Sequence, residues 1–434
     1  MTSGLASRPI ADAARTPLAV APSQPPSNPL RQLGDTLSRN QRVGYILMLG
    51  ALVALGPFTI DLYLPAFPQV AADLGASDVA IQLTLTATMI GFGLGQLLVG
   101  PLSDSLGRKK PLLIATALHV VASIAVALAP TVELVMVGRV FQGIGAAGGA
   151  VVAMAVVRDL FAGQGLIRML SRMALVTGLA PVLAPVIGSQ LLRVVDWREV
   201  FFVLAGYGVL IGLIVATKLF ETLPPAARGR SEKGIVRKRY KTLLSEPAFV
   251  GIAIVGAMTF TTLFAYLSSS SFILQDVYGL SAQQYGVVFG INSMGLVACT
   301  QIASRIMRRF PPRTVTALGL GVMSVGALSL LIGSVFDVGL IAVLASLFLV
   351  VSPAGLIIPS VQVTALANHG KEAGTAASLI GAANFGVAGL LSPLVGAMGI
   401  SVASMGIVMV GALAVGHLSF WIVVRPRVQS VVVA

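Results

Sequence analysis

Residues 44–68 read GYILMLGALVALGPFTIDLYLPAFP, an apolar run interrupted by one acid, Asp61. A helix needs about 20 apolar residues to cross a hydrocarbon core about 30 Å thick, so this run is long enough to span a membrane. The 434 residues of the chain are 56% hydrophobic and only 10% charged, whereas a soluble domain is about 25% charged. This composition excludes an ordinary soluble enzyme and a disordered protein. One cysteine excludes a disulfide scaffold.

Eleven more apolar runs follow the first, so the sequence predicts an all-α integral membrane protein with twelve transmembrane helices. We expect these helices at approximately 44–68, 80–102, 111–129, 132–156, 169–191, 199–220, 248–271, 284–303, 313–334, 338–364, 374–397 and 401–424. A transmembrane β-barrel would show alternating segments of about 10 residues instead, and the long apolar runs exclude it.

The predicted helices form two sets of six, and a repeat supports this division. The pair Tyr63-Leu64 precedes a loop that reads LGAS, and 203 residues later Tyr266-Leu267 precedes a loop that reads YGLS. Two six-helix halves in parallel repeat are typical of transporters whose site lies near the membrane midplane between the halves. We expect a flexible tail at 1–43, bundles at 44–220 and 248–424, a basic linker at 221–247 and a second tail at 425–434.

The distribution of basic residues predicts the orientation in the membrane. If the N-terminus is inside, 26 of the 29 Lys and Arg residues fall in inside segments, Arg193 and Arg198 fall outside, and Arg139 lies within a helix. Cytoplasmic loops carry such an excess of positive charge. We therefore expect a multi-pass membrane protein with both termini in the cytoplasm. The same dispersal argues against nucleic-acid binding, although the net charge is +13, because no basic module gathers these charges.

The loop after the second predicted helix reads GPLSDSLGRKK at 100–110. Topology alone explains its three cations but not the spacing of Gly100, Asp104 and Gly107. Glycine permits a sharp turn. Asp104 is expected near the N-terminus of the following helix, where a carboxylate offsets the helix dipole and can pair with a base such as Arg108. We interpret Gly100, Asp104, Gly107 and Arg108 as a loop that controls conformation.

This loop resembles the signature of the major facilitator superfamily. Five further stretches resemble the Bcr/CflA branch of drug:proton antiporters: TIDLYLPAFP at 59–68, GRVFQGIGAA at 138–147, WREVFF at 197–202, SSSSFILQDVYGLS at 268–281 and AGTAAS at 373–378. The resemblance covers residues 44–424 and implies a twelve-helix fold. The antiporter motif of the fifth helix usually ends in Gly-Pro-x-x-Gly-Gly, whereas the corresponding stretch here ends in Ala184-Pro185-Val-Ile-Gly188-Ser189.

Asp61 and Arg139 are the predicted proton-coupling residues. Asp61 is the one acid that we place inside a membrane helix, and a charge there is costly, so that it is functional by default. At 1.5 Å per residue, Asp61 lies about 6 Å and Arg139 about 9 Å below the outer surface. The two residues are therefore at similar depth on the first and fourth helices. They are expected to pair directly or through water, and the family motif at Arg139 supports this role.

Two further sets of residues complete the predicted site. The fifth helix carries a gating motif of Gly178, Pro181, Pro185 and Gly188, because two prolines four residues apart bend a helix. Polar side chains at membrane depth need partners or a wet cavity. The candidate cavity residues are Tyr63, Gln82, Gln142, Tyr266, Asn292 and Asn384.

Together with these features, the resemblance implies a secondary transporter of a bacterial inner membrane that exports small lipophilic or cationic drugs in exchange for protons. No Gly-x4-Gly-Lys-Ser/Thr motif occurs, so ATP is not expected to drive it. We expect no catalytic residue, metal or cofactor, and we expect a monomer in the lipid bilayer. The alternative within transport is a dedicated exporter of one metabolite, such as a sugar or an amino acid. A membrane enzyme would need a catalytic cluster, and a substrate sensor an added signalling domain; the sequence shows neither.

Overall fold

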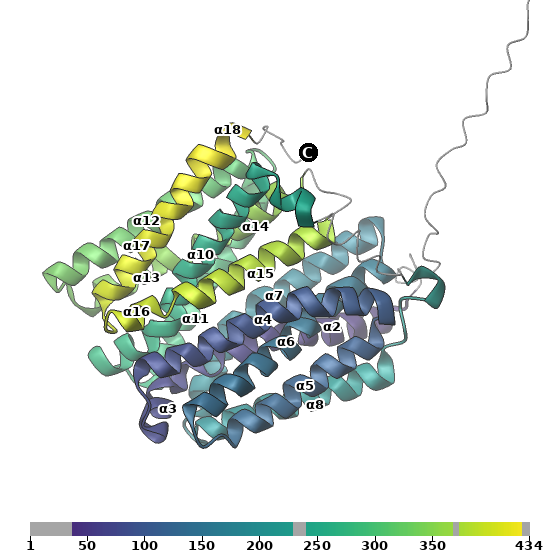
Figure 1. Ribbon diagram of the computed structural model, residues 1–434, viewed down its shortest axis with the longest axis horizontal. Coiled ribbons are helices and arrows are strands. Elements are labelled where there is room, and N and C mark those ends of the chain that lie inside the picture. Colours follow the sequence, from purple (N-terminus) through teal and green to yellow (C-terminus); the bar gives the residue numbers. More distant parts are fainter. Residues whose placement is uncertain (1–36, 229–239, 368–372, 428–434) are drawn as a thin grey trace, which may run out of the picture.

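The computed structural model describes residues 37–228, 240–367 and 373–427, and helices make up nearly all of them (Figure 1). The first bundle contains α2 (Arg39–Asp61), η1 (Leu64–Ala66), α3 (Phe67–Leu74), α4 (Asp78–Leu106), α5 (Lys109–Ala127), α6 (Val132–Leu160), α7 (Gly163–Leu191) and α8 (Trp197–Lys218), followed by η2 (Pro225–Ala227). The second bundle contains α10 (Pro247–Phe272), η3 (Ile273–Val277), α11 (Ala282–Ile306), α12 (Pro312–Phe336), α13 (Gly339–Val351), α14 (Ala354–Leu366), α15 (Ala373–Leu391), α16 (Leu394–Ala397), α17 (Val402–Leu418), η4 (Ser419–Val424) and α18 (Arg425–Arg427).

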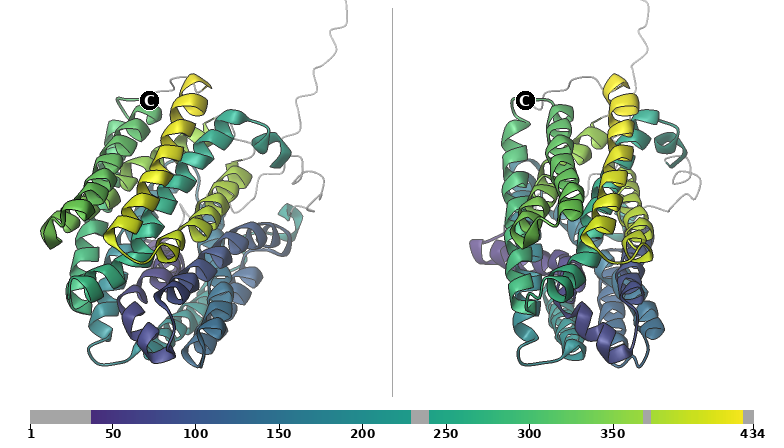
Figure 2. Two further views of the ribbon diagram at one scale, coloured as in Figure 1. Left: turned by 60° about the vertical axis from the view of Figure 1, so that its left-hand side comes forward. Right: turned by 90° about the vertical axis from the view of Figure 1, so that its left-hand side faces the viewer.

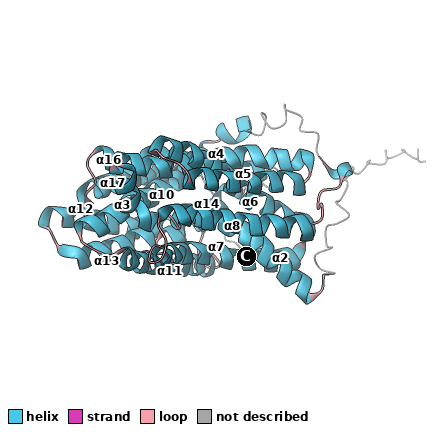
Figure 3. Cartoon of the chain, turned by 90° about the horizontal axis from the view of Figure 1, so that it is seen from below, coloured by secondary structure: helices cyan, strands magenta, loops and turns pink. Residues whose placement is uncertain are grey.

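The helices confirm the predicted membrane fold. Among the described residues, eleven helical segments are long and apolar enough to cross a membrane, and no strand occurs there (Figure 3). α7 supplies the twelfth span. Its second part, Gly178–Leu191, is a shorter apolar helix, and the first part carries Arg168 and Arg172.

Local sequence explains where several helices begin and break. Ser38 and Ser281 each form a capping box at the start of a helix, with Gln41 and Gln284 respectively. The first membrane span breaks after Asp61, where η1 and α3 replace α2. Pro65 and Pro68 follow this break, and proline lacks the N–H that would continue a helix.

The two bundles meet closely at one end and lean apart toward the other (Figures 1 and 2). We call the end at which the bundles meet the distal end. It holds η1, α3, η3 and α16. The other is the linker end, which holds the start of α2, the turn between α4 and α5, and η2 (Figure 1). α4 packs against α15, and α7 packs against α11, across the interface. The arrangement puts the end of α2 between the bundles.

The outer surface of the bundles is apolar. Large hydrophobic side chains are exposed there, including Leu98, Ile114, Leu128, Val335 and Ile341. A soluble protein rarely exposes apolar area on this scale, whereas lipid chains accept it. The buried polar groups lie inside the bundles, as a membrane fold requires.

Small residues on α6 allow its neighbours to approach at backbone distance. An added Cβ at Gly143 would lie 2.3 Å from the Thr88 carbonyl oxygen of α4, and one at Gly145 would lie 2.6 Å from the Ala115 carbonyl oxygen of α5. Gly148 is equally close to the Ala115 side chain, at 2.6 Å. This glycine series resembles a nucleotide fingerprint in spacing, but its role here is helix packing.

Candidate functional site

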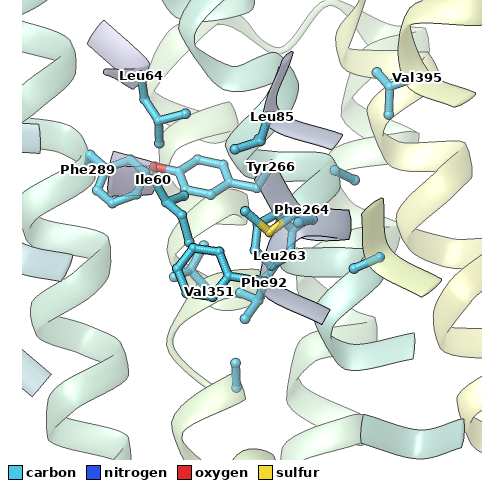
Figure 4. Packing of buried hydrophobic residues seen from close by; sticks show 14 of the residues in the cluster. Ile60, Leu64, Leu85, Phe92, Leu263, Phe264, Tyr266, Phe289, Val351 and Val395 are labelled. Carbon is cyan, nitrogen blue, oxygen red and sulfur yellow. The ribbon is translucent and has the colours of Figure 1, made fainter. Parts of the chain in front are cut away.

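Asp61 is the last residue of α2 and lies at the interface between the bundles. Its side chain is buried, with 5% of the residue exposed. The preceding residue, Ile60, lies beside Tyr266 and Phe289 of the second bundle (Figure 4). η1, which follows Asp61, contacts both α10 and α11. The acid of the first bundle is therefore presented to the second one.

A buried polar group on the second bundle faces this region. Asn292 donates from Nδ2 to the Tyr266 hydroxyl at 3.1 Å, and the hydroxyls of Ser270 and Tyr285 are 3.2 Å apart. Tyr266 stacks on Phe289, with ring centroids 5.4 Å apart. The Asn292 amide and the hydroxyls of Tyr266, Ser270 and Tyr285 thus form a buried polar cluster in the second bundle.

Arg139 of α6 is fully buried and holds the end of α2. Its Nη1 donates to the Thr59 carbonyl oxygen at 2.8 Å and to Gln142 Oε1 at 2.7 Å. The last carbonyls of a helix lack intrahelical partners, and Thr59 lies two residues before the helix ends. The guanidinium also lies over the Tyr63 ring at 5.0 Å and the Phe201 ring at 5.5 Å. Arg139 is thereby a C-terminal cap for the broken helix.

The predicted Asp61–Arg139 ion pair is not formed. Among the described residues, the ion pairs involve neither side chain, and Nε and Nη2 of Arg139 have no hydrogen-bond partner there. The sequence predicted similar membrane depths for Asp61 and Arg139, and the bond from Arg139 to Thr59, two residues before Asp61, agrees with that prediction. Instead of pairing with the acid, Arg139 bonds the backbone at the end of α2.

A buried hydrogen-bond chain continues from Arg139 to α5. Gln142 Nε2 donates to Ser123 Oγ at 2.8 Å, Ser123 Oγ lies 3.4 Å from His119 Nε2, and His119 Nδ1 lies 3.4 Å from the Gln142 carbonyl oxygen. The chain fixes Arg139 in place and engages both ends of the Gln142 amide inside the first bundle.

The loop between α4 and α5 forms a charge cluster at the linker end. Arg108 Nη1 lies 2.5 Å from Asp104 Oδ1, and Arg108 Nε lies 2.8 Å from Asp159 Oδ2 at the end of α6. Burial alone would lower the pKa of Arg108, but the carboxylates of Asp159 and Asp104 raise it above its ordinary value. The guanidinium therefore stays charged and ties α4 to α6.

Asp104 does not lie at the N-terminus of α5, where the sequence predicted it; another acid occupies that position. Asp104 lies in the last turn of α4, and Glu221 caps α5 instead. Glu221 Oε1 accepts the backbone N–H of Arg108 at 2.7 Å, and Oε2 accepts that of Lys109 at 3.3 Å. Gly107 has φ +94°, and an added Cβ there would lie 2.5 Å from Glu221 Oε2. The carboxylate that offsets the dipole of α5 is thus that of Glu221, at the start of the linker.

The pKa of Glu221 reflects this capping. Burial would raise the pKa of Glu221, but the backbone N–H groups of Arg108, Leu223 and Lys109 outweigh it and hold the pKa below its ordinary value. Thr222 donates to Asp159 Oδ2 at 3.1 Å. The start of the linker is therefore hydrogen-bonded both to the end of α6 and to the α4–α5 loop.

The motif of the fifth predicted helix lies in α7 and contacts both bundles. Pro181 and Pro185 are inside the helix. An added Cβ at Gly188 would lie 2.2 Å from the Leu62 carbonyl oxygen, and one at Gly178 would lie 3.4 Å from Val297 of α11. α7 thus packs against the end of α2 on one side and against the second bundle on the other.

The remaining candidate residues are buried in different places. Tyr63 lies next to Arg139, with its hydroxyl 3.5 Å from Thr84 Oγ1. Asn384 Oδ1 has no partner among the described residues and lies beside Gly256 of its own bundle. Gln82 lies against α16 across the interface. Gly100 lies on α4, where an added Cβ would lie 3.7 Å from Val151 of α6.

Several partners of these residues could not be found from the sequence. Ser270 is one of four consecutive serines at 268–271, and the run alone does not show which hydroxyl lies next to Tyr285. Asp159 and Glu221 are far from Arg108 in the chain, 51 and 113 residues away. Their role becomes visible only when the helices are packed.

These features define a class: a membrane transporter built of two helical bundles, with a buried acid at their interface and a charged loop at one end. The Major Facilitator Superfamily matches residues 47–393, and the chain belongs to this family. An uncharacterized MFS-type transporter of Bacillus subtilis, YdgK, is 35% identical over 343 residues, which cover 79% of this chain and 85% of that protein.

Other relatives support the predicted Bcr/CflA-type branch. A bicyclomycin resistance protein homolog of Haemophilus influenzae is 28% identical, covering 80% of this chain and 87% of that protein. The multidrug resistance protein MdtL of Klebsiella pneumoniae is 29% identical, covering 62% and 68%. A solved D-xylose-proton symporter shares the fold, with a TM-score of 0.70 and 17% identity, covering 91% of this chain and all of that one.

Proposed function

We propose that this protein exports small lipophilic or cationic drugs from a bacterial cell in exchange for protons, by alternating access. The observation that carries the proposal is Asp61, a carboxylate buried at the bundle interface and without an ion-pair partner among the described residues. Drug resistance in the relatives supports the substrate class. A proton gradient is a sufficient energy source, since 100 mV moves one charge with about 2.3 kcal/mol.

Proton coupling follows from the position of Asp61. Two bundles that close around a charged carboxylate must desolvate it, which is costly. Protonation removes this cost and permits the distal end to close. When a drug enters from the linker end, release of the proton restores the charge and attracts a cationic ligand. The proton and the drug thus compete for one site, which is the condition for exchange.

In the proposed orientation, the protein lies in the inner membrane of the bacterial cell. The linker, both tails and the Asp104–Arg108–Asp159 cluster are on the cytoplasmic side. The lean of the bundles then corresponds to an inward-facing state (Figure 2). We propose that 44–220 and 248–424 move as units, and that α7, with Pro181 and Pro185, bends as they move. A monomer is sufficient, since both bundles belong to one chain.

A growth-inhibition panel tests the function. Cells with and without the protein are exposed to unrelated toxic compounds, and accumulation of each hit is measured with and without a proton uncoupler. Resistance to several compounds that the uncoupler abolishes is the expected result. Resistance to one compound alone, or export of one sugar or amino acid, would identify a dedicated exporter instead. Export that survives the uncoupler contradicts proton coupling.

A further inference from the structure

Two hydrogen bonds join the bundles at the distal end. Gln275 of η3 donates from Nε2 to the Pro65 carbonyl oxygen of η1 at 3.2 Å. Gln283 of α11 donates from Nε2 to the Ser189 carbonyl oxygen of α7 at 2.9 Å. In both pairs a glutamine of the second bundle reaches the backbone of the first. These bonds exist only while the distal end is closed.

The backbone geometry prepares both bonds. Ser189 lies in the last turn of α7, where carbonyls lack intrahelical partners. Gly286 lets α11 approach this turn, since an added Cβ would lie 2.3 Å from Ser189 Oγ. Gln275 is held by a second bond from Nε2 to Ser271 Oγ at 2.7 Å. The bond to Ser271 thus orients the Gln275 amide toward the Pro65 carbonyl.

A third glutamine at the distal end has the opposite character. Gln82 of α4 is fully buried, and neither Oε1 nor Nε2 has a hydrogen-bond partner among the described residues. It lies against α16 of the second bundle, where an added Cβ at Gly396 would lie 2.3 Å from Oε1. A buried amide without partners destabilises the state that buries it. Separation of α4 from α16 removes this burial.

We propose that these three glutamines are positioning residues that set the equilibrium of the distal end with opposite signs. Gln275 and Gln283 stabilise the closed end, because their bonds cross the interface. Gln82 favours the open end, because it gains hydrogen-bond partners only when α4 and α16 part. The inference rests on the alternating access of the proposed function, but it requires neither a particular drug nor the proton.

Distance measurements between two spin labels test the signs. Cysteines replace Ala72 of α3 and Met398, both exposed at the distal end, in a Cys299→Ser background. Double electron–electron resonance then reports the short and long distances without drug. Gln82→Leu should raise the ratio of short to long, and Gln275→Leu and Gln283→Leu should lower it. A hydrogen bond of ordinary strength predicts a change of about threefold to tenfold for each variant.

Gln284→Leu is the matched control, because Gln284 bonds only Ser281 of its own helix and should leave the ratio unchanged. Gln82→Met and Gln283→Glu replace any variant that fails to fold: Met removes the buried amide, and Glu removes the donor. Shifts of all three glutamine variants in one direction, or a Gln82 shift toward the long distance, overturn the proposal. If drug changes the ratio of short to long distances in the wild type, but every glutamine variant has the same ratio as the wild type, the proposal is overturned and the proposed function is not. A wild-type distance that no drug or pH changes overturns both.

Discussion

At the scale of single residues, burial separates the roles of Asp61 and Arg139. The acid ends α2 at the bundle interface, whereas Arg139 bonds the Thr59 carbonyl and lies over two aromatic rings. A guanidinium is planar and bonds in a fixed fork, and an ammonium is a point charge. The shape of Arg139 therefore matters as well as its charge.

Arg139→Lys is expected to lower the rate of drug transport by roughly tenfold at equal expression. The ammonium loses most of the contact with the rings of Tyr63 and Phe201, which is worth about 2 kcal/mol when desolvated. Tyr63→Phe is the matched control, because it keeps the ring under the guanidinium and should retain most of the activity. Initial export rates in everted vesicles measure both variants. Full activity of Arg139→Lys would show that charge alone is sufficient.

The sequence predicted the level of these residues but not their direction. A rise of 1.5 Å per residue is sufficient to estimate depth, and it brought Arg139 to the end of α2. The direction of a side chain depends on the break after Asp61 and on what packs there, which no local pattern contains. Tyr285 is a comparable omission, since its hydroxyl lies 3.2 Å from that of Ser270, 15 residues away in the chain.

At the scale of elements, capping explains the α4–α5 loop. The sequence predicted a turn at Gly107, and the structure confirms it with φ +94°. It also predicted that a carboxylate would lie at the N-terminus of α5, but the carboxylate is Glu221 and not Asp104. Helix dipoles accept an acid from any segment that reaches them, so spacing within the loop does not identify which acid it is.

The lowered pKa of Glu221 predicts a pH dependence of stability. A carboxyl whose folded pKa is lowered contributes stability above its unfolded pKa, about 4.3 for Glu, and this contribution is lost as the pH falls through the folded pKa. We expect the melting temperature of the wild type to fall more than that of Glu221→Gln when the pH is lowered from 6 to about 3.5. Thermal unfolding in detergent measures the difference. Parallel decreases in the two proteins would mean that Glu221 does not cap α5.

At the scale of the whole molecule, hydropathy predicted most of the fold. A helix must be long enough to cross the bilayer. Eleven helical segments among the described residues are long and apolar enough to do so, and Gly178–Leu191 is a shorter apolar helix. The predicted ends at 80 and 102 miss α4 by several residues, because α4 continues to Leu106. The lean of the bundles follows from contacts such as Gln275 with Pro65, which hydropathy does not describe.

The orientation is a prediction for labelling. Cys299 is the one cysteine of the chain, so Cys299→Ser gives a background in which single cysteines report their side of the membrane. A cysteine at Arg228, at the start of the linker, should react with an impermeant maleimide only after the cells are opened. A cysteine at Ala72 should react in intact cells. The reverse pattern would invert the topology and contradict the cytoplasmic linker.

Proton release on drug binding tests the central claim most directly. Purified protein in weakly buffered solution is mixed with a drug identified by the growth panel, and the protons released per molecule are counted with a pH indicator. The wild type is expected to release protons, and Asp61→Asn to release none while still binding the drug with weaker affinity. If Asp61→Asn releases as many protons as the wild type, the coupling site lies elsewhere, and the account of Asp61 is wrong.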